Sequence, residues 1–265
     1  MMKTQELTRL AAAAGPAVLA GSAALAADAP KVDSAELDKA FEVLATFDWG
    51  SEPKALNPID RAIIATEGDA EGRKALEVRL AAVLGSDASR AAKDYACRAL
   101  SAAGTAASVP ALSALLSDGE LSHMGRYALQ RIPDAEAGEA LREALTELDG
   151  DLRIGVIESL GGRQDTAATP ALSRLLNDSD AATVAAAATS LAKIGTPEAA
   201  KALVAAVAKA PDAAKTPVTD ACFRCAERLV ADGKRAEAVA VYKTFTGAEQ
   251  PRHVRLAATR GMLGQ

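Results

Sequence analysis

The sequence predicts an all-α protein, an α-solenoid of stacked antiparallel helix pairs. Apolar residues recur with helical spacing, whereas the long apolar/polar alternation typical of strands is lacking. Four leucines near helix ends, Leu100, Leu129, Leu160 and Leu191, are 29, 31 and 31 residues apart. Such a period indicates a repeat array, because one helix pair cannot bury its apolar face alone and must stack on its neighbours.

The first 26 residues are predicted to be a secretory signal peptide. Lys3 and Arg9 precede an Ala-rich apolar run, and residues 24–26 supply a small-x-small cleavage pattern. Gly15–Pro16 interrupts the run, which is shorter than the roughly 20 strongly apolar residues of a membrane span. The sequence therefore favours export, to the periplasm or the medium, over a retained anchor, and predicts no membrane span in the mature chain.

Residues 27–61 are predicted to form an N-terminal capping segment. Three of the scarce aromatic residues gather there, namely Phe41, Phe47 and Trp49. They are expected to seal the first helix pair against solvent, as the end of a stacked array requires. The alternative is an aromatic recognition patch.

Residues 62–265 are predicted to hold about five or six repeat units. In the regular units a helix ends in Leu followed shortly by Gly, as in the segments 95–104, 156–162 and 187–195. Glycine at this place can adopt the left-handed conformation that closes a helix. A second apolar helix with Pro near its start follows, in the segments 109–116, 169–176 and 197–204.

The units at both ends diverge from this pattern. Residues 62–84 form a degenerate first pair, and Leu229 begins a late unit with its second helix at 234–245. Residues 254–263 resemble the first helix of a further, incomplete unit. An Ala-faced helix is a poor cap, which favours a longer parent polypeptide over a terminal cap.

Aspartates fall in the turns between units, at Asp118, Asp149, Asp178 and Asp212. A carboxylate at such a place can accept hydrogen bonds from free backbone N–H groups and interact with the positive end of the next helix. We therefore interpret these residues as helix caps rather than as a ladder of metal ligands.

The repeat segments resemble HEAT repeats of the phycobilisome-lyase-like type. The resemblance rests on "VPALSALLSD", "ATPALSRLLNDSD", "VAAAATSLAKIGTPEAAKALVAAV" and "VRLAATRGMLG", and covers roughly residues 70–265. Residues 40–50 are similar to the leading segment of exported bacterial HEAT proteins, in some of which the array precedes a carbohydrate-active domain. The resemblance implies a HEAT-like superhelix. It departs from the family pattern at residues 131–133, where Arg-Ile-Pro replaces the Gly turn.

Composition bears on the partner. The formal net charge is −5, without the clustered Lys and Arg that replace phosphate counterions, which argues against a nucleic-acid surface. Aromatic residues make up only 3%, so stacking platforms for bases are few. Neither a cofactor nor a metal is predicted.

The sequence therefore predicts a non-catalytic, monomeric protein-binding or scaffold module whose partner is another protein or an appended domain. The expected binding face is the concave surface lined by second helices. It carries Glu139, Arg142, Glu143, Arg174, Lys201 and Lys243. One alternative is an accessory scaffold region of a larger exported enzyme, for example a carbohydrate-active one. A second is a lyase-like or thiol redox activity.

The redox alternative requires Cys222 and Cys225, which form a C-x-x-C pair. This pair lies inside a predicted helix rather than at a strand-to-helix turn, and no histidine follows it. Spacing of three residues places both thiols on one helix face, expected to point into the core. Buried structural cysteines are the favoured interpretation, with a local disulfide or a functional pair as alternatives.

Overall fold

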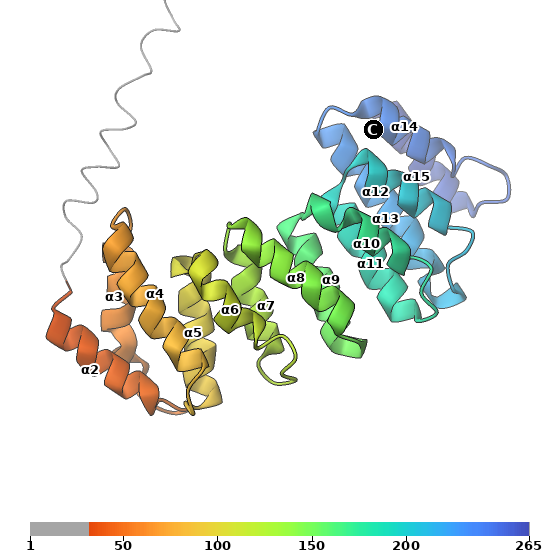
Figure 1. Cartoon of the computed structure of the whole chain (residues 1–265). Helices are drawn as coiled ribbons and strands as arrows, with labels where there is room; N and C mark the ends of the chain where they lie inside the picture. The colour runs from red at the N-terminus through yellow and green to blue at the C-terminus, as the bar shows by residue number, and fades with distance from the viewer. Residues whose placement is uncertain (1–31, 265) are drawn as a thin grey trace, which may run out of the picture. The chain divides into compact units, whose positions relative to one another are not determined.

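The computed structural model describes residues 32–264 (Figure 1). Over these residues the chain forms fourteen α-helices, three short 3-10 helices and no strand, which confirms the all-α prediction. The predicted signal peptide lies outside the described residues, so export stays a prediction. Among the helices described, none is long and apolar enough to cross a bilayer. The chain divides into two compact units, one ending at Ala99 and the other beginning at Leu100.

Unit 1 contains three helices, a 3-10 turn and the beginning of a fourth helix. These are α2 (Ser34–Ala45), η1 (Pro53–Leu56), α3 (Asn57–Ala65), α4 (Ala70–Leu84) and the first part of α5 (Arg90–Ala103). Helix α2 packs on α3 around the buried residues Leu44 and Ile59. Because α3 begins at Asn57, the sequence-based boundary after residue 61 falls inside a helix.

Local caps explain where two helices of unit 1 begin. The Asp33 carboxylate accepts a hydrogen bond from the backbone N–H of Ala35 at the start of α2. Asp69 does the same for Gly72 at the start of α4. Each short carboxylate satisfies an N–H group that has no partner within its helix, which stabilises the helix end.

Unit 2 contains the regular part of the array, from the end of α5 onward. Its elements are η2 (Ala106–Ser108), α6 (Val109–Ser113), α7 (Ser122–Arg131), α8 (Ala135–Glu147), α9 (Gly150–Arg163), η3 (Thr166–Ala168), α10 (Thr169–Leu175), α11 (Ala181–Ile194), α12 (Pro197–Ala206), α13 (Asp212–Ala231), α14 (Arg235–Lys243) and α15 (Arg252–Leu263). Proline occupies the first turn of α6, α10 and α12, as predicted, where its missing N–H costs no hydrogen bond.

The helices of unit 2 stack in two rows. The first helices α7, α9, α11 and α13 pack on one another in order, and each second helix packs on the first helix of the next pair (Figure 1). The recurring leucines all lie in this core with no exposed surface, at Leu100, Leu129, Leu160, Leu191 and Leu229. The leucine spacing therefore identifies structurally equivalent positions, and the α-solenoid prediction is confirmed.

Glycine follows the helix end at two of the three predicted places, and it is left-handed at one of them. Gly104 follows α5, and its N–H donates to the carbonyl of Leu100 without a positive φ. Gly195 follows α11 in the left-handed conformation (φ 70°), as predicted. Gly161 and Gly162 were wrongly expected to stop α9, which continues to Arg163. A Cβ on Gly161 would lie 2.5 Å from Oγ of Ser190 in α11. The lack of a side chain at Gly161 therefore allows α11, the next first helix, to approach α9 closely.

The left-handed residue after α9 is Gln164 (φ 56°), the one non-glycine residue with positive φ between residues 32 and 264. Its Oε1 accepts a hydrogen bond of 2.8 Å from Nη2 of Arg228 in α13. The Arg228 side chain also passes over Gly195, where a Cβ would lie 2.3 Å from its Cγ. Arg228 thus joins the C-terminal ends of α9, α11 and α13.

The predicted capping aspartates are confirmed only in part. Asp118 and Asp178 accept backbone N–H groups in the turns before α7 and α11. The cap of α11 itself is Asp180, whose pKa is lowered by hydrogen bonds from Thr183 and neighbouring backbone N–H groups. Asp212 lies inside α13 and pairs with a lysine one turn later. Across residues 32–264, no cluster of three or more His, Cys, Asp or Glu side chains could hold a metal ion.

Candidate functional site

The predicted binding face is distributed over four second helices. Glu139, Arg142 and Glu143 lie on α8, Arg174 on α10, Lys201 on α12 and Lys243 on α14. All of these residues are exposed except Arg142, which is half-buried. The face therefore offers charged side chains to solvent, but only part of it borders a hollow.

Arg142 has a structural role that the sequence did not indicate. Its guanidinium forms an ion pair with Asp165, whose side chain is only 9% exposed. Asp165 also accepts the backbone N–H of Ala168 at the start of the short 3-10 helix before α10. Arg142 thus holds the turn between α9 and α10, and we no longer count it among the side chains free to meet a partner.

A shallow groove lies between α6 and α8, with a volume of about 330 Å³. Pro110 and Ser113 line it from α6, and Glu143 and Glu147 from α8. Glu143 is thus the one predicted face residue that borders this groove. The groove is small and half polar, so it offers little apolar area to a partner.

The predicted aromatic cap is not a sealed cluster. Trp49 is 67% exposed, which contradicts a role in excluding solvent. Phe41 is half-buried beneath the guanidinium of Arg79, whose Cζ lies 3.9 Å from the ring centroid. Phe47 is also half-buried, and its carbonyl accepts a hydrogen bond from the Ser89 hydroxyl. A recognition role for Trp49 stays a prediction.

The C-x-x-C pair lies in the core. Cys222 and Cys225 are free thiols in α13 with no exposed surface, in agreement with the interpretation as packed residues. Burial raises the pKa of Cys222 to about 12, with the neighbouring thiol adding to the shift, and burial raises the pKa of Cys225 to about 11. Reactive cysteines need an accessible thiolate, so these two thiols lack the properties of a redox centre.

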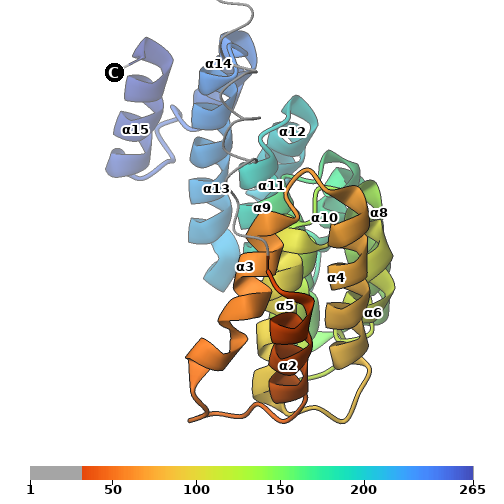
Figure 2. The same cartoon turned by 90° about the vertical axis from the view of Figure 1, so that its left-hand side faces the viewer.

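A larger hollow lies between α13 and α15. Helix α15 is the first helix of the next pair in chain order, but it packs mainly on α14 rather than on α13. In Figure 2 it stands apart from α13. The space between the two helices forms two adjoining parts of about 520 and 410 Å³, which share Phe223 and Ala257. We call this hollow the C-terminal groove.

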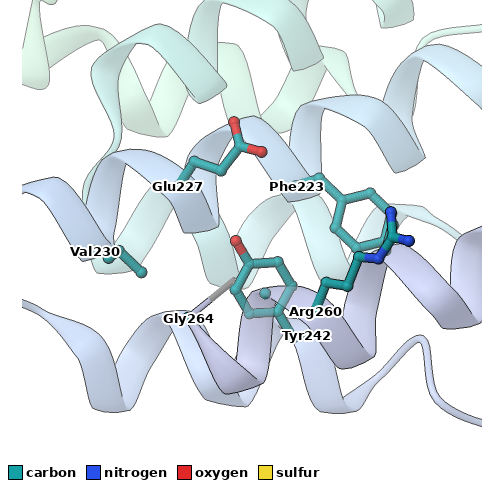
Figure 3. A pocket seen from close by; sticks show the side chains of 8 residues that line it. Phe223, Glu227, Val230, Tyr242, Arg260 and Gly264 are labelled. Carbon is teal, nitrogen blue, oxygen red and sulfur yellow. The ribbon is translucent and has the colours of Figure 1, made fainter.

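The walls of the C-terminal groove come from residues one or two turns apart on each helix. On α13 they are Lys215, Thr216, Thr219, Asp220, Phe223, Glu227 and Val230. On the opposite side they are His253, Val254, Ala257, Arg260, Gly261 and Gly264. Figure 3 shows the part nearest the helix C-termini, with Tyr242 of α14 between the two walls.

Three aromatic side chains support the C-terminal groove. The ring centroid of Phe223 lies 5.9 Å from that of Tyr242 and 5.0 Å from that of Phe245. Tyr242 and Phe245 are buried, whereas Phe223 is half-buried and faces the groove. Burial, with the nearby Glu227 carboxylate, raises the pKa of the Tyr242 hydroxyl. The groove therefore has a rigid aromatic base beside an accessible apolar wall.

The sequence explains why the stack opens at this place. When the repeats are aligned on Leu160, Leu191 and Leu229, Val230 corresponds to Gly161 and Ala192. Those smaller residues are buried because the next first helix lies directly on them. Val230 is larger and 37% exposed.

Helix α15 finds its close contact on α14 instead. A Cβ on Gly261 would lie 2.3 Å from Cζ of Tyr242, so only glycine admits the ring there. Ala258, one turn earlier, is fully buried. Small residues on α15 thus direct it against α14 and away from α13.

The sequence analysis missed this groove although one signal was present. Phe223 lies within the C-x-x-C segment, between the two thiols. Phe223, Tyr242 and Phe245 are three of the chain's eight aromatic residues, which comprise four Phe, three Tyr and one Trp. A second concentration of scarce aromatics in one predicted unit could have identified the site.

The helix pairs and their stacking define the class of protein as an α-solenoid. Residues 138–221, from α8 to the middle of α13, match the family model for HEAT repeats. The chain is thus a HEAT-repeat protein over this range, which confirms the resemblance at the level of the repeat. The phycobilisome-lyase-like subtype and the exported bacterial type stay predictions.

Comparison with solved structures finds matches of low sequence identity. An engineered protein is 20% identical and superposes with a TM-score of 0.42. The alignment covers 84% of this chain and 66% of that chain, so this chain spans just under two thirds of its length. Human deoxyhypusine hydroxylase in complex with glycerol is 17% identical, covering 87% of this chain and 97% of that one at 0.36. A designed armadillo repeat protein in complex with the peptide (KR)4 is 13% identical, covering 86% and 98% at 0.37.

At such low TM-scores these superpositions carry no argument, and the fold rests on the helix pairs themselves. A comparison with curated proteins found no match.

Proposed function

We propose that this chain is a non-catalytic, monomeric protein-binding scaffold that acts after export from the cytoplasm. The observation that carries the proposal is the C-terminal groove, an elongated hollow with an aromatic base between α13 and α15, where the stack opens. Grooves between parallel helices suit an added helix, whose apolar face can fill them. The partner is another protein or a domain appended to the same polypeptide.

The unusual titratable groups support this function because their environments are structural. Burial lowers the pKa of Arg163, whose guanidinium donates hydrogen bonds to the carbonyls of Leu129, Ile132 and Asp134. Burial also raises the pKa of Tyr95, whose hydroxyl donates to Asp60 at 2.7 Å. Arg163 and Tyr95 thus tie helices together, and neither lines the C-terminal groove.

Site-directed photo-crosslinking tests the binding function in cells. A photoreactive residue replaces Val230, which lines the groove, and the matched control replaces Thr259, an exposed residue of α15 outside the lining. We expect one identified protein to be crosslinked from position 230 and not from position 259. No protein partner at position 230, at Glu143 or at Trp49 would contradict a binding scaffold.

Export has a separate test. The mature chain is expected to begin at Ala27, after the predicted cleavage pattern, and to be found in the periplasmic or secreted fraction. Intact-mass measurement of the fractionated protein checks both points. A full-length chain in the cytoplasmic fraction would contradict export while leaving the binding function open to the crosslinking test.

A further inference from the structure

The two walls of the C-terminal groove carry opposite charges. Asp220 and Glu227 lie seven residues apart on α13, and His253 and Arg260 lie seven residues apart on α15. The spacing of seven places each pair on one helix face, two turns apart. At pH 7 these charges belong to Asp220, Glu227 and Arg260, while Lys215 at the start of the α13 wall pairs with Asp212. We call the α13 wall the acidic edge and the α15 wall the basic edge.

The two edges face each other without pairing. Glu227 and Arg260 line the same part of the groove, and Asp220 and His253 line the other part. Within residues 32–264 no ion pair joins these side chains (Figure 3 shows Glu227 and Arg260 apart). Unpaired charges on opposite walls can form ion pairs with a molecule that lies between them.

The shape of the groove matches a helix. Its lining residues run along α13 and α15 for about three turns, and the walls carry apolar side chains, Phe223 and Val230 on one side and Ala257 on the other. In the regular repeats the next first helix lies directly against the preceding one, as α11 does against α9. Against α13 the corresponding space is open. An amphipathic helix is thus the element that the repeat geometry accommodates here.

We propose that the C-terminal groove binds an amphipathic helix of a partner protein, with acidic side chains toward α15 and basic side chains toward α13. This inference rests on the proposed binding function and names the chemistry of its partner. The apolar stripe of the bound helix covers Phe223 and Ala257. Its two flanks complete the ion pairs that Glu227 and Arg260 lack.

A second copy of this chain fits the groove less well. Its exposed helix α15 carries Arg252, Arg255 and Arg260 and no acidic residue. Placed in the groove of another copy, that helix would set like charges against the basic edge. The complementary occupant therefore comes from a different protein.

Three synthetic helical peptides test the charge rule on the full chain. All share one apolar stripe, and their flanks are Glu on one side and Lys on the other, Lys on both sides, or Glu on both sides. Fluorescence anisotropy of the labelled peptides measures binding. We expect the mixed peptide to bind best and its binding to weaken as salt rises.

Charge reversals should change the preference in opposite directions. Arg260→Glu weakens binding of the mixed peptide by about fivefold to tenfold and favours the all-Lys peptide. Glu227→Lys favours the all-Glu peptide instead. Lys193→Glu on α11 and Glu237→Lys on α14, both exposed and outside the groove lining, are the matched controls and should leave all three affinities unchanged.

Filling the groove should abolish binding without unfolding the chain. Ala257 is exposed and lines both parts, so Ala257→Trp blocks the groove. Thr259→Trp adds the same bulk to an exposed position outside the lining, and should bind normally. Circular dichroism checks that both variants keep their helices.

Several results would overturn the inference. Equal binding of the three peptides, unchanged preferences in the reversal variants, or full binding by Ala257→Trp would each do so. Self-association in sedimentation experiments that Ala257→Trp abolishes would assign the groove to a second copy instead. If position 230 still crosslinks an identified protein, the binding function stands although the charge rule fails.

Discussion

Two first-helix interfaces of unit 2 differ in how closely their helices approach. Between α9 and α11, Gly161 meets Ser190, whose hydroxyl donates a 2.9 Å hydrogen bond to the carbonyl of Ile157. Between α13 and α15 the corresponding surface carries Val230 and stays open. The difference shows that aligned positions of one array can form a closed core in one repeat and an open groove in another.

The largest expected effect contrasts a leucine of each region. Leu160→Ala removes a fully buried side chain and should destabilise the array by about 3 kcal/mol, because it leaves a cavity. Leu256→Ala removes a side chain that is 48% exposed and should cost less than about 0.5 kcal/mol. Urea unfolding followed by circular dichroism measures both. Equal shifts in the midpoint would mean that α15 is packed as tightly as α9.

The second contrast concerns the equivalent small and large residues. Gly161→Val places a branched side chain against Ser190 and should cost about 2 kcal/mol through overpacking. Val230→Ala, at the aligned position in α13, should change stability by less than about 0.5 kcal/mol, since alanine also favours the helix. The same unfolding experiment applies. A tolerated Gly161→Val would show that α9 and α11 can separate freely.

The third contrast compares two arginines that bind backbone carbonyls. Arg163 donates to three carbonyls around the start of α8, and Arg163→Met should cost about 2 kcal/mol because buried acceptors lose their partner. Arg235 donates to one exposed carbonyl, that of Met262, at 3.2 Å, and Arg235→Met should cost less than about 0.5 kcal/mol. A larger loss for Arg235→Met in thermal unfolding would contradict this ranking.

The smallest expected effect concerns the thiols of α13. Although the groove exposes one side of this helix, Cys222 and Cys225 point into the core, and their pKa values of about 12 and 11 lie above the ordinary value of about 8.5. Labelling by a thiol reagent at neutral pH should therefore be no faster than at buried Cys97, and should become rapid only on unfolding.

These pKa shifts also give the sign of a pH effect. The folded thiols hold their protons to higher pH than the unfolded ones, so their contribution to stability is complete below about pH 8.5. It is lost as the pH rises toward 11. Replacing both thiols, Cys222→Ala with Cys225→Ala, should flatten this alkaline decline in the urea midpoint. An unchanged decline would place its cause elsewhere in the chain.

The repeat core could be predicted because it depends on periodicity. The buried leucines at positions 100, 129, 160 and 191 follow from spacing and apolar character, whereas Leu229 lies in a divergent unit outside that spacing. The helix starts at Pro110 and Pro170 follow from the fixed φ of proline. Such features are local in sequence, so no knowledge of distant contacts was needed.

The errors arise where distant contacts decide. Glycine permits both a left-handed turn and a close approach, and only the position of α11 shows which role Gly161 has. Arg142 could be assigned to the surface until its pairing with Asp165 was seen. The groove itself depends on α15 choosing α14 over α13, through the contact of Gly261 with Tyr242. No pattern within one helix contains that choice.

The arginine that spans three repeats also has a mechanical consequence. Arg228 fastens the ends of α9, α11 and α13 to one another, through Gln164 and across Gly195. Under load, this part of the array should deform as one stiff block. Among residues 32–264, no comparable side-chain hydrogen bond joins α15 to α13. We therefore expect the array to deform most easily between these two helices. Helix α15 should then shift more readily than the helices before it when a force acts along the array.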